Sequence, residues 1–296
     1  MNETFLVTGA TGKTAAMVAA QLREKGATVR ALVRDEAKAG ELKASGVDLA
    51  RGDFEDPASL DRALEGVTSV FLVTPPSPHD YTMAEGFVAA AKRSSSRPRI
   101  VRLSAIKACE DGPSESSRNH GRIDRMLVNS DLAYVILRPN YFMQNFLGSA
   151  ETIVGQGLLF QGTGDARIGF IDVRDIADVA ASSLLDRSWD RAIYDLTGPA
   201  TLSFHEVAKE LGGALGREVK YMAITPDQIR KSVLDKGWGE WGANLFADYA
   251  AAYGRGWGDF TTAFVEKIAG HAPRSVSGFA REVFAPTVTR HGAADA

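Results

Sequence analysis

The stretch VTGATGKTA, residues 7–15, decides the fold. A short apolar strand pattern ends at Thr8, and Gly9, Gly12 and Ala15 follow at intervals of three where the chain turns into a helix. Gly9 permits a tight turn, Gly12 lets the backbone approach a pyrophosphate, and the small Ala15 lets the helix lie close to the strand. Two glycines alone would also fit a simple turn. The strand before them and the helix after them favour a dinucleotide site, with the phosphates at the helix N-terminus.

The chain that follows repeats this alternation of strand and helix patterns. Short β-branched or apolar runs lie at residues 4–8, 28–33, 48–51, 69–74, 99–103 and 133–138. Runs such as VFLV and YVIL show no polar alternation, which is typical of parallel strands covered on both faces. We therefore predict an α/β fold: a doubly wound parallel sheet of the Rossmann type with a smaller, mainly helical C-terminal substrate domain.

Changes in the residue pattern along the chain suggest where the domains divide. We expect residues 1–150 to form the dinucleotide-binding domain and residues 151–296 to form a substrate-binding or cover region. Residues 170–190 are expected to return to the first domain, because IGFIDVRDIADVAASSLL has a strand-to-helix pattern. Ser203 and Glu206 have the spacing of a capping box and predict the start of a further helix.

Composition excludes several classes of function. The chain has 296 residues, a net charge of −3 and a pI near 6.0, so a nucleic-acid partner is not expected. Cys109 is the only cysteine, which excludes an internal disulfide and multi-thiolate metal sites. The histidines lack paired ligand spacing, and we predict no metal; they lie at positions 79, 120, 205, 271 and 291. Without a signal-peptide pattern or a long apolar run, we expect a cytoplasmic protein with no membrane partner.

The residues expected to contact the dinucleotide follow the ends of successive strands. They are Thr8, Gly9, Thr11, Gly12, Lys13 and Thr14; Arg34 and Lys38; Asp53 and Phe54 near the adenine; and Thr74 and Pro75 near the nicotinamide. A carboxylate at the end of the second strand is typical of NAD sites, whereas a 2′-phosphate favours arginine there. The sequence has Arg34 first and Asp35 next, so NADPH is the favoured cofactor and NADH the less favoured one. Asp35 facing the ribose is the open alternative.

The motifs TGATG and GDFED, a serine after RIVRL and the sequence ILRP together resemble the short-chain dehydrogenase/reductase superfamily. Most reductases of that superfamily use a Tyr-x-x-x-Lys pair, in which lysine lowers the pKa of the tyrosine that protonates the product alkoxide. None of the seven tyrosines here is followed four residues later by lysine. Where the pair would fall, SRNHGRIDRML places His120 and Asp124, which share one side of a helix.

This departure, taken with NYFMQNF after ILRP, resembles the atypical NmrA-like branch. That branch includes transcription-linked redox sensors, NADPH-dependent quinone reductases, triphenylmethane-dye reductases and azoreductase-like proteins. The resemblance runs from Thr4 to about the helix after Ser203. It implies an NAD(P)H-dependent oxidoreductase that transfers hydride to a conjugated acceptor such as a quinone, an azo compound or a triphenylmethane compound. The alternative is a non-catalytic NADP(H)-binding redox sensor that acts through a protein partner.

A conjugated acceptor suits a site without a strong acid, because delocalisation makes its hydride adduct weakly basic. Water or His120 could complete the protonation. A nearby carboxylate would raise the pKa of His120 and make it a proton donor; the competing interpretation is that His120 and Asp124 form a solvated or ribose-contacting helix face. Ser104, by the resemblance, lies near the nicotinamide as a second catalytic candidate. Whether it donates a proton or only a hydrogen bond stays open.

Aromatic residues after ILRP are candidates for the substrate site. Tyr141 and Phe142 directly follow a predicted strand and would suit a flat aromatic or quinonoid substrate, although aromatic residues at such spacing also fit a core. The glycine-rich segment at 155–169 is expected to be loop or irregular strand, and its closure over substrate stays open. A homodimer is possible on the sequence alone.

Overall fold

The computed structural model describes residues 3–294, with side chains described as far as residue 290 in the last helix. The chain divides into two compact units. The first comprises Met1–Arg138 and Ile176–Asp195, and the second comprises Pro139–Asp175 and Leu196–Ala296. The first unit ends before position 150, because the aromatic segment that follows Arg138 packs within the second unit.

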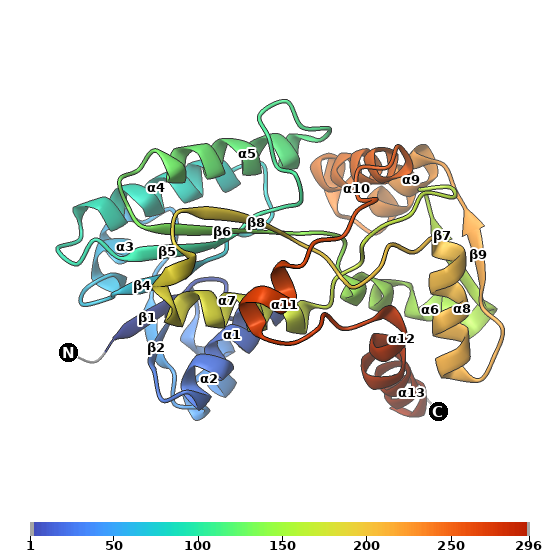
Figure 1. The fold of residues 1–296 in the computed structure, drawn as a ribbon, viewed down its shortest axis with the longest axis horizontal. Coiled ribbons are helices and arrows are strands. Elements are labelled where there is room, and N and C mark those ends of the chain that lie inside the picture. Colours follow the sequence, from blue (N-terminus) through green and yellow to red (C-terminus); the bar gives the residue numbers. More distant parts are fainter. Residues whose placement is uncertain (1–2, 295–296) are drawn as a thin grey trace. The chain divides into compact units, whose positions relative to one another are not determined.

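The first unit contains the seven-stranded sheet (Figure 1). Its strands are β1 (Thr4–Val7), β2 (Thr28–Val33), β3 (Asp48–Arg51), β4 (Ser69–Leu72), β5 (Arg99–Leu103), β6 (Tyr134–Pro139) and β8 (Ala192–Leu196). Its helices are α1 (Lys13–Glu24), η1 (Glu36–Ala39), α2 (Gly40–Ala44), α3 (Pro57–Ala63), α4 (Asp80–Arg93), α5 (Glu115–Val128), most of α7 (Val173–Leu185) and η3 (Arg187–Trp189). The predicted doubly wound parallel sheet is confirmed, and each predicted strand agrees with an observed one to within two residues.

The strand order is β3-β2-β1-β4-β5-β6-β8. Val7 pairs in parallel with Ala31 of β2 on one side and with Phe71 of β4 on the other. The order therefore reverses at β1, and ligands of such sheets bind beside the carboxyl ends of the strands at this reversal. The pairs Leu72–Arg102 and Leu103–Leu137 continue the parallel register through β5 and β6. The loops after β1, β2, β4 and β5 consequently emerge at one edge of the sheet.

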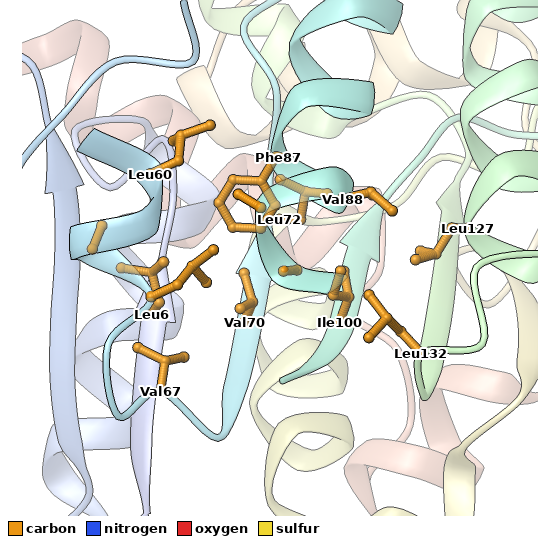
Figure 2. Packing of buried hydrophobic residues seen from close by; sticks show 14 of the residues in the cluster. Leu6, Leu60, Val67, Val70, Leu72, Phe87, Val88, Ile100, Leu127 and Leu132 are labelled. Carbon is orange, nitrogen blue, oxygen red and sulfur yellow. The ribbon is translucent and has the colours of Figure 1, made fainter. Parts of the chain in front are cut away.

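Apolar packing covers the sheet on the face of α3, α4 and α5, and α1 and α7 lie on the other face (Figure 1). Figure 2 shows the packing on the first of these faces, where Phe87 of α4 lies among Leu60, Leu72 and Val88. All four side chains are almost completely buried. The burial of both faces explains why these strands lack polar alternation in the sequence.

The second unit is mainly helical. Its elements are η2 (Met143–Ser149), α6 (Ala150–Gln156), β7 (Leu158–Gln161), α8 (Phe204–Leu215), β9 (Lys220–Ala223), α9 (Pro226–Asp235), α10 (Gly239–Gly254), α11 (Phe264–Ala269), α12 (Val276–Phe279), η4 (Ala280–Phe284) and α13 (Ala285–Ala294). The predicted capping box is confirmed, because Ser203 Oγ accepts the Glu206 amide and the Glu206 carboxylate accepts the Ser203 amide. Residues 158–161, inside the segment expected to be loop or irregular strand, form β7 and pair in parallel with β9.

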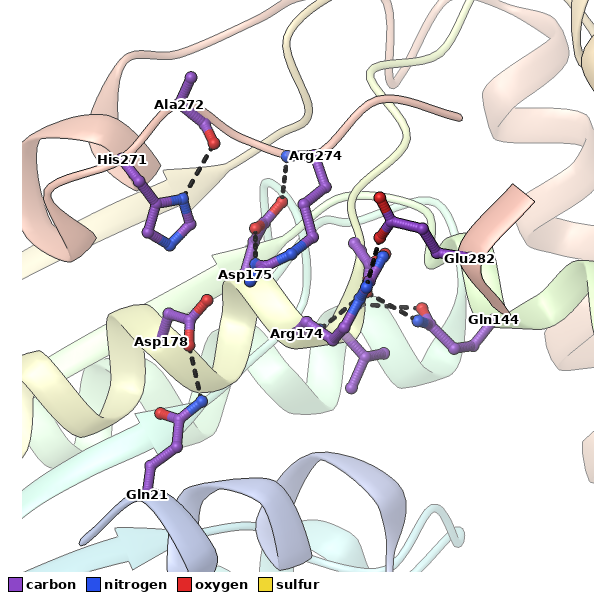
Figure 3. A network of polar contacts seen from close by, with 11 residues as sticks. Gln21, Gln144, Arg174, Asp175, Asp178, His271, Ala272, Arg274 and Glu282 are labelled. Carbon is purple, nitrogen blue, oxygen red and sulfur yellow. Dashed lines mark hydrogen bonds and ion pairs between the residues drawn. The ribbon is translucent and has the colours of Figure 1, made fainter. Parts of the chain in front are cut away.

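Polar contacts from the N-terminal half of α7 and the residue before it lie within each unit (Figure 3). Within the first unit, Gln21 Nε2 of α1 donates to Asp178 Oδ1 of α7 at 2.6 Å. Within the second, Arg174 lies between Asp172 and Glu282, at 2.8 Å from a carboxylate oxygen of each. Asp172 is fully buried, and although burial alone would raise its pKa, the hydrogen bonds from Arg174 lower it. Among the residues described, none of the helices has the length and apolar character needed to cross a membrane.

Candidate functional site

The turn after β1 has the geometry of a phosphate-binding loop. Gly9 has φ of 62°, the left-handed region that favours glycine, and the Gly12 amide donates to the Gly9 carbonyl at 2.8 Å. A Cβ on Gly12 would lie 3.1 Å from that carbonyl oxygen. Among residues 3–294, no side-chain hydrogen bond caps the N-terminus of α1 at Gly12, so the backbone N–H groups of its first turn are left for a ligand. These residues fit a dinucleotide pyrophosphate, as the sequence predicts.

The residues predicted around this turn divide into two groups. Thr11 and Lys13 are exposed and Thr14 is half-buried, so these side chains face the open side of the turn. Thr8 is fully buried. Its hydroxyl donates to the Val73 carbonyl at 2.9 Å and accepts from the Val73 amide at 2.8 Å, which fastens the end of β1 to the end of β4. The side chain of Thr8 therefore supports the turn, and a contact of this residue with the cofactor stays a prediction.

The end of β2 distinguishes between the two coenzymes. The guanidinium of Arg34 is exposed and, among the residues described, takes part in no hydrogen bond or ion pair. The Asp35 carboxylate instead accepts the Ala37 amide at 3.0 Å and caps η1, which also carries the exposed Lys38. A local backbone donor thus engages one oxygen of the carboxylate that could have faced the ribose. The guanidinium remains open to a 2′-phosphate.

Two further predicted pairs lie at the same edge of the sheet. After β3, Asp53 accepts the Glu55 amide at 3.1 Å, and the rings of Phe54 and Phe87 lie 5.9 Å apart between centroids. After β4, Thr74 is half-buried and Pro75 is exposed. Their contacts with adenine and nicotinamide stay predictions. In the sheet, β4 adjoins β1, whereas β3 lies on the far side of β2.

A buried charge network lies where the resemblance to the short-chain reductases would place their Tyr–Lys pair. Its centre is Asp124 of α5, which is 2% exposed. One carboxylate oxygen forms an ion pair with Arg102 of β5, and the other accepts Ser104 Oγ at 2.8 Å and Arg138 Nε of β6 at 2.8 Å. Arg102 also extends its second terminal nitrogen to Nδ1 of His120 at 2.9 Å. The structure thus brings together both predicted catalytic residues, although the two bond to different members of the network.

The prediction of a raised pKa for His120 is wrong. Burial lowers its pKa well below the usual value of 6.5, and the nearby positive charges of Arg102 and Arg138 lower it further. We had expected Asp124 to stabilise the charged imidazole. In the structure the carboxylate of Asp124 is taken by two arginines and a serine, so His120 meets a guanidinium instead. The alternative prediction, that Asp124 lies on a solvated helix face, is also wrong, because Asp124 is buried.

The sequence analysis missed the two arginines of this network. Arg102 lies within the apolar strand RIVRLS and is 1% exposed, and Arg138 lies in the ILRP strand end. A charged residue inside a strand that is covered on both faces requires a buried partner, because an unpaired charge there is very costly. The arginine within this apolar strand was therefore a signal, available in the sequence, of a buried ion pair. It would have directed attention to the acidic residues of the covering helix, Glu115 and Asp124, of which Asp124 is buried.

The loop between β5 and α5 packs closely on the first turns of that helix. A Cβ on Gly121 would lie 2.4 Å from the backbone carbonyl carbon of Cys109, so only glycine fits beside His120. Lys107 of the same loop has φ of 46°, an uncommon conformation for lysine. Burial raises the pKa of the half-buried Cys109 thiol, and Asp111 raises it further, which disfavours the reactive thiolate.

The predicted substrate residues belong to the second unit. The Tyr141 ring lies in an aromatic cluster, with centroids 5.4 to 6.0 Å from those of Phe146, Phe170, Phe204 and Tyr253. Burial raises the pKa of Tyr141, so its hydroxyl stays protonated at neutral pH. The backbone of Phe142 bridges to Ile171. This packing is what a core residue shows; a substrate contact by Tyr141 or Phe142 stays a prediction.

Comparison with known proteins identifies the family. The profile of the family described as NAD(P)H-binding matches residues 9–187. The chain belongs to this NAD(P)H-binding family. It is 35% identical over 277 residues to the NAD(P)H azoreductase of Xenophilus azovorans, and the match covers 94% of this chain and 96% of that protein.

Two solved structures share the whole fold. The NADPH-dependent quinone oxidoreductase of Escherichia coli, solved with NADPH, has a TM-score of 0.86 at 24% identity and covers 95% of this chain and 99% of its own. The triphenylmethane reductase of Citrobacter sp. has a TM-score of 0.83 at 21% identity, with 95% and 100% covered. The resemblance to the NmrA-like branch is thereby confirmed. These findings place the chain among the NAD(P)H-dependent oxidoreductases, and they do not favour the alternative of a regulator without turnover.

Proposed function

We propose that the chain is an NADPH-dependent reductase that transfers hydride to conjugated, electron-poor acceptors such as azo compounds, quinones and triphenylmethane compounds. The observation that carries this proposal is the network around Asp124. Where a ketone reductase of the superfamily has lysine beside an acidic tyrosine, this chain has a carboxylate held by two guanidiniums. It therefore lacks the proton donor that an alkoxide product requires.

The chemistry of the acceptor then decides what can be reduced. Positioned proton transfer contributes roughly 10²–10⁴-fold to a rate, so a simple ketone would react poorly at this site. A quinone or azo group spreads the incoming electron pair over a conjugated system, and its reduced form takes a proton from solvent without a strong acid. When bound, NADPH supplies the hydride. The task left to the protein is to bind and orient the two reactants.

Support for NADPH over NADH comes from the end of β2. Arg34 is exposed without a partner among the described residues, whereas Asp35 caps η1. The azoreductase and quinone-oxidoreductase names of the relatives agree with the acceptor class proposed. Tyr141 and Phe142 remain candidates for the substrate contact on this proposal.

A panel of acceptors tests the proposal directly. The purified protein is mixed with NADPH or NADH and with a benzoquinone, an azo dye, a triphenylmethane dye or a simple aromatic ketone, and coenzyme absorbance is followed. We expect turnover of at least one conjugated acceptor, faster with NADPH, and no measurable reduction of the ketone. A Gly12→Val variant serves as the control, because a side chain there would block the turn. Faster reduction of the ketone than of every conjugated acceptor would overturn the proposal.

A further inference from the structure

The contact between Arg102 and His120 determines which imidazole nitrogen carries the proton. Arg102 Nη2 lies 2.9 Å from His120 Nδ1. A guanidinium has five N–H donors and no acceptor, so Nδ1 must accept this hydrogen bond and carries no proton. A neutral imidazole has one N–H, which therefore lies on Nε2. The fold thus presents His120 to its surroundings as an N–H donor.

The alternative protonation states conflict with the same contact. A proton on Nδ1 would place two donors 2.9 Å apart. A fully protonated imidazolium would do the same and would add a positive charge beside the guanidiniums of Arg102 and Arg138. The carboxylate of Asp124 cannot offset that charge, because Arg102, Arg138 and Ser104 already occupy it.

The hydroxyl of Ser104, in contrast to the imidazole of His120, has no free proton to donate. Its Oγ lies 2.8 Å from Asp124 Oδ2, and an ionised carboxylate only accepts hydrogen bonds. The single hydroxyl proton of Ser104 is consequently directed at Asp124. Toward any further group Ser104 offers only lone pairs. Toward a bound substrate, therefore, Ser104 can only accept a hydrogen bond and His120 can only donate one.

We propose that His120 acts as a neutral hydrogen-bond donor, through Nε2–H, to the acceptor atom on which negative charge develops during hydride transfer, and that Arg102 is the positioning residue that fixes this tautomer. The inference rests on the proposed function. The hydride brings two electrons and one hydrogen to the acceptor, which leaves a negative charge on a quinone oxygen or an azo nitrogen. His120 stabilises that charge and keeps its own proton, because its loss would leave an imidazolate. Solvent supplies the proton that completes the product.

The charges around His120 favour this role. The charges that act on His120 are the positive ones of Arg102 and Arg138. The carboxylate of Asp124 pairs with both arginines, and Asp80 and Asp195 interact with Arg102 and Arg138 respectively. A fixed donor backed by positive charge in a partly dehydrated site stabilises a developing anion without reorganisation. A neutral imidazole suits this purpose at neutral pH, since it needs no titration to remain a donor.

Two substitutions of His120, one without and one with an N–H donor, test its role as a hydrogen-bond donor. His120→Phe keeps a planar ring without an N–H, and His120→Gln can return an amide N–H near the place of Nε2. We expect kcat with the best acceptor to fall about 10²-fold in His120→Phe and less than about tenfold in His120→Gln, as for the loss and retention of one fixed donor. NADPH affinity, measured by calorimetry, should stay within about twofold in both. Equal losses of kcat in the two variants would overturn the donor role.

The pH dependence separates a neutral donor from a proton donor. If His120 lost its proton during turnover, kcat would fall as pH rises through its pKa. For a neutral donor, the ratio of wild-type to His120→Phe kcat stays constant from about pH 6 to pH 9. A ratio that falls toward one across this range would contradict the proposal.

The tautomer is tested without any substrate. With ¹⁵N-labelled histidine, the five histidines give separate ring-nitrogen signals, and His120→Phe identifies those of His120. We expect a protonated Nε2 and an unprotonated Nδ1 at pH 7. An imidazolium or an Nδ1–H tautomer would overturn the inference. If no acceptor is reduced by the wild type, the proposed function and the donor role both fail, and the spectrum still decides the tautomer independently.

Discussion

Replacement of Arg34 by glutamate is the most direct test of coenzyme choice. Arg34 follows β2, next to the phosphate-binding turn, and its guanidinium is exposed with no partner among the residues described. Only NADPH has a 2′-phosphate for it to bind. Exposure limits the contact, because water and salt screen charges at a surface. A bidentate arginine–phosphate contact at such a site contributes about 1–2 kcal/mol, which corresponds to a change of roughly 5- to 30-fold in affinity.

We therefore expect Arg34→Ala to raise the Kd for NADPH by about 5- to 30-fold and Arg34→Glu to raise it further, because glutamate repels the phosphate. The Kd for NADH should change by less than about twofold in Arg34→Ala. Isothermal titration calorimetry with both coenzymes measures these values, and the NADPH effect should shrink at high salt. Arg93→Ala is the matched control, since Arg93 is an exposed arginine of α4 that pairs with Asp61. An equal loss for NADPH and NADH would refute the assignment of Arg34 to the 2′-phosphate.

Four further outcomes follow from the geometry. Gly12→Val should abolish binding of both coenzymes in the same calorimetric assay, because its Cβ would meet a carbonyl at 3.1 Å. Asp124→Ala should lower the free energy of unfolding in urea by about 3–5 kcal/mol, since it leaves two guanidiniums without their partner. Ser203→Ala should cost about 1 kcal/mol in the same measurement through loss of the helix cap. The pKa of His120 is lowered in the folded protein, so its contribution to the free energy of unfolding is present above about pH 6.5 and is lost as pH falls toward the folded pKa. Between about pH 6.5 and 5, the free energy of unfolding should therefore fall less in His120→Phe than in the wild type.

The fold and the phosphate-binding turn were predictable because their signals are local. Apolar runs without alternation mark strands that are buried on both faces, and the glycine at position 9 marks a backbone conformation with positive φ. The capping box at Ser203 and Glu206 is similarly a matter of residues three apart. Each of these features depends on neighbours in the sequence. The structure adds their register and burial.

The electrostatics of the candidate site around His120 and Asp124 were not predictable from the same kind of signal. His120 and Asp124 are one helical turn apart, which suggests a direct pairing that would raise the pKa of the histidine. The outcome depends instead on Arg102 and Arg138, which come from two strands distant in sequence and reach Asp124 in the folded protein. The sequence shows which charges exist. Only the packing of α5 on β5 and β6 shows which of them meet.

The sign of the charge at position 124 connects the fold to the chemistry proposed. A lysine there would support a tyrosine that delivers a proton, and a reductase of that kind can reduce a carbonyl to an alcohol. An aspartate there recruits two arginines, directs the proton of Ser104 inward and leaves His120 neutral with its N–H available. Such a site can stabilise an anion but has no acid strong enough to neutralise an alkoxide. On the proposed function, the reactions open to such a site are those in which the acceptor itself spreads the charge, and we propose that this requirement, more than any single contact, selects conjugated substrates.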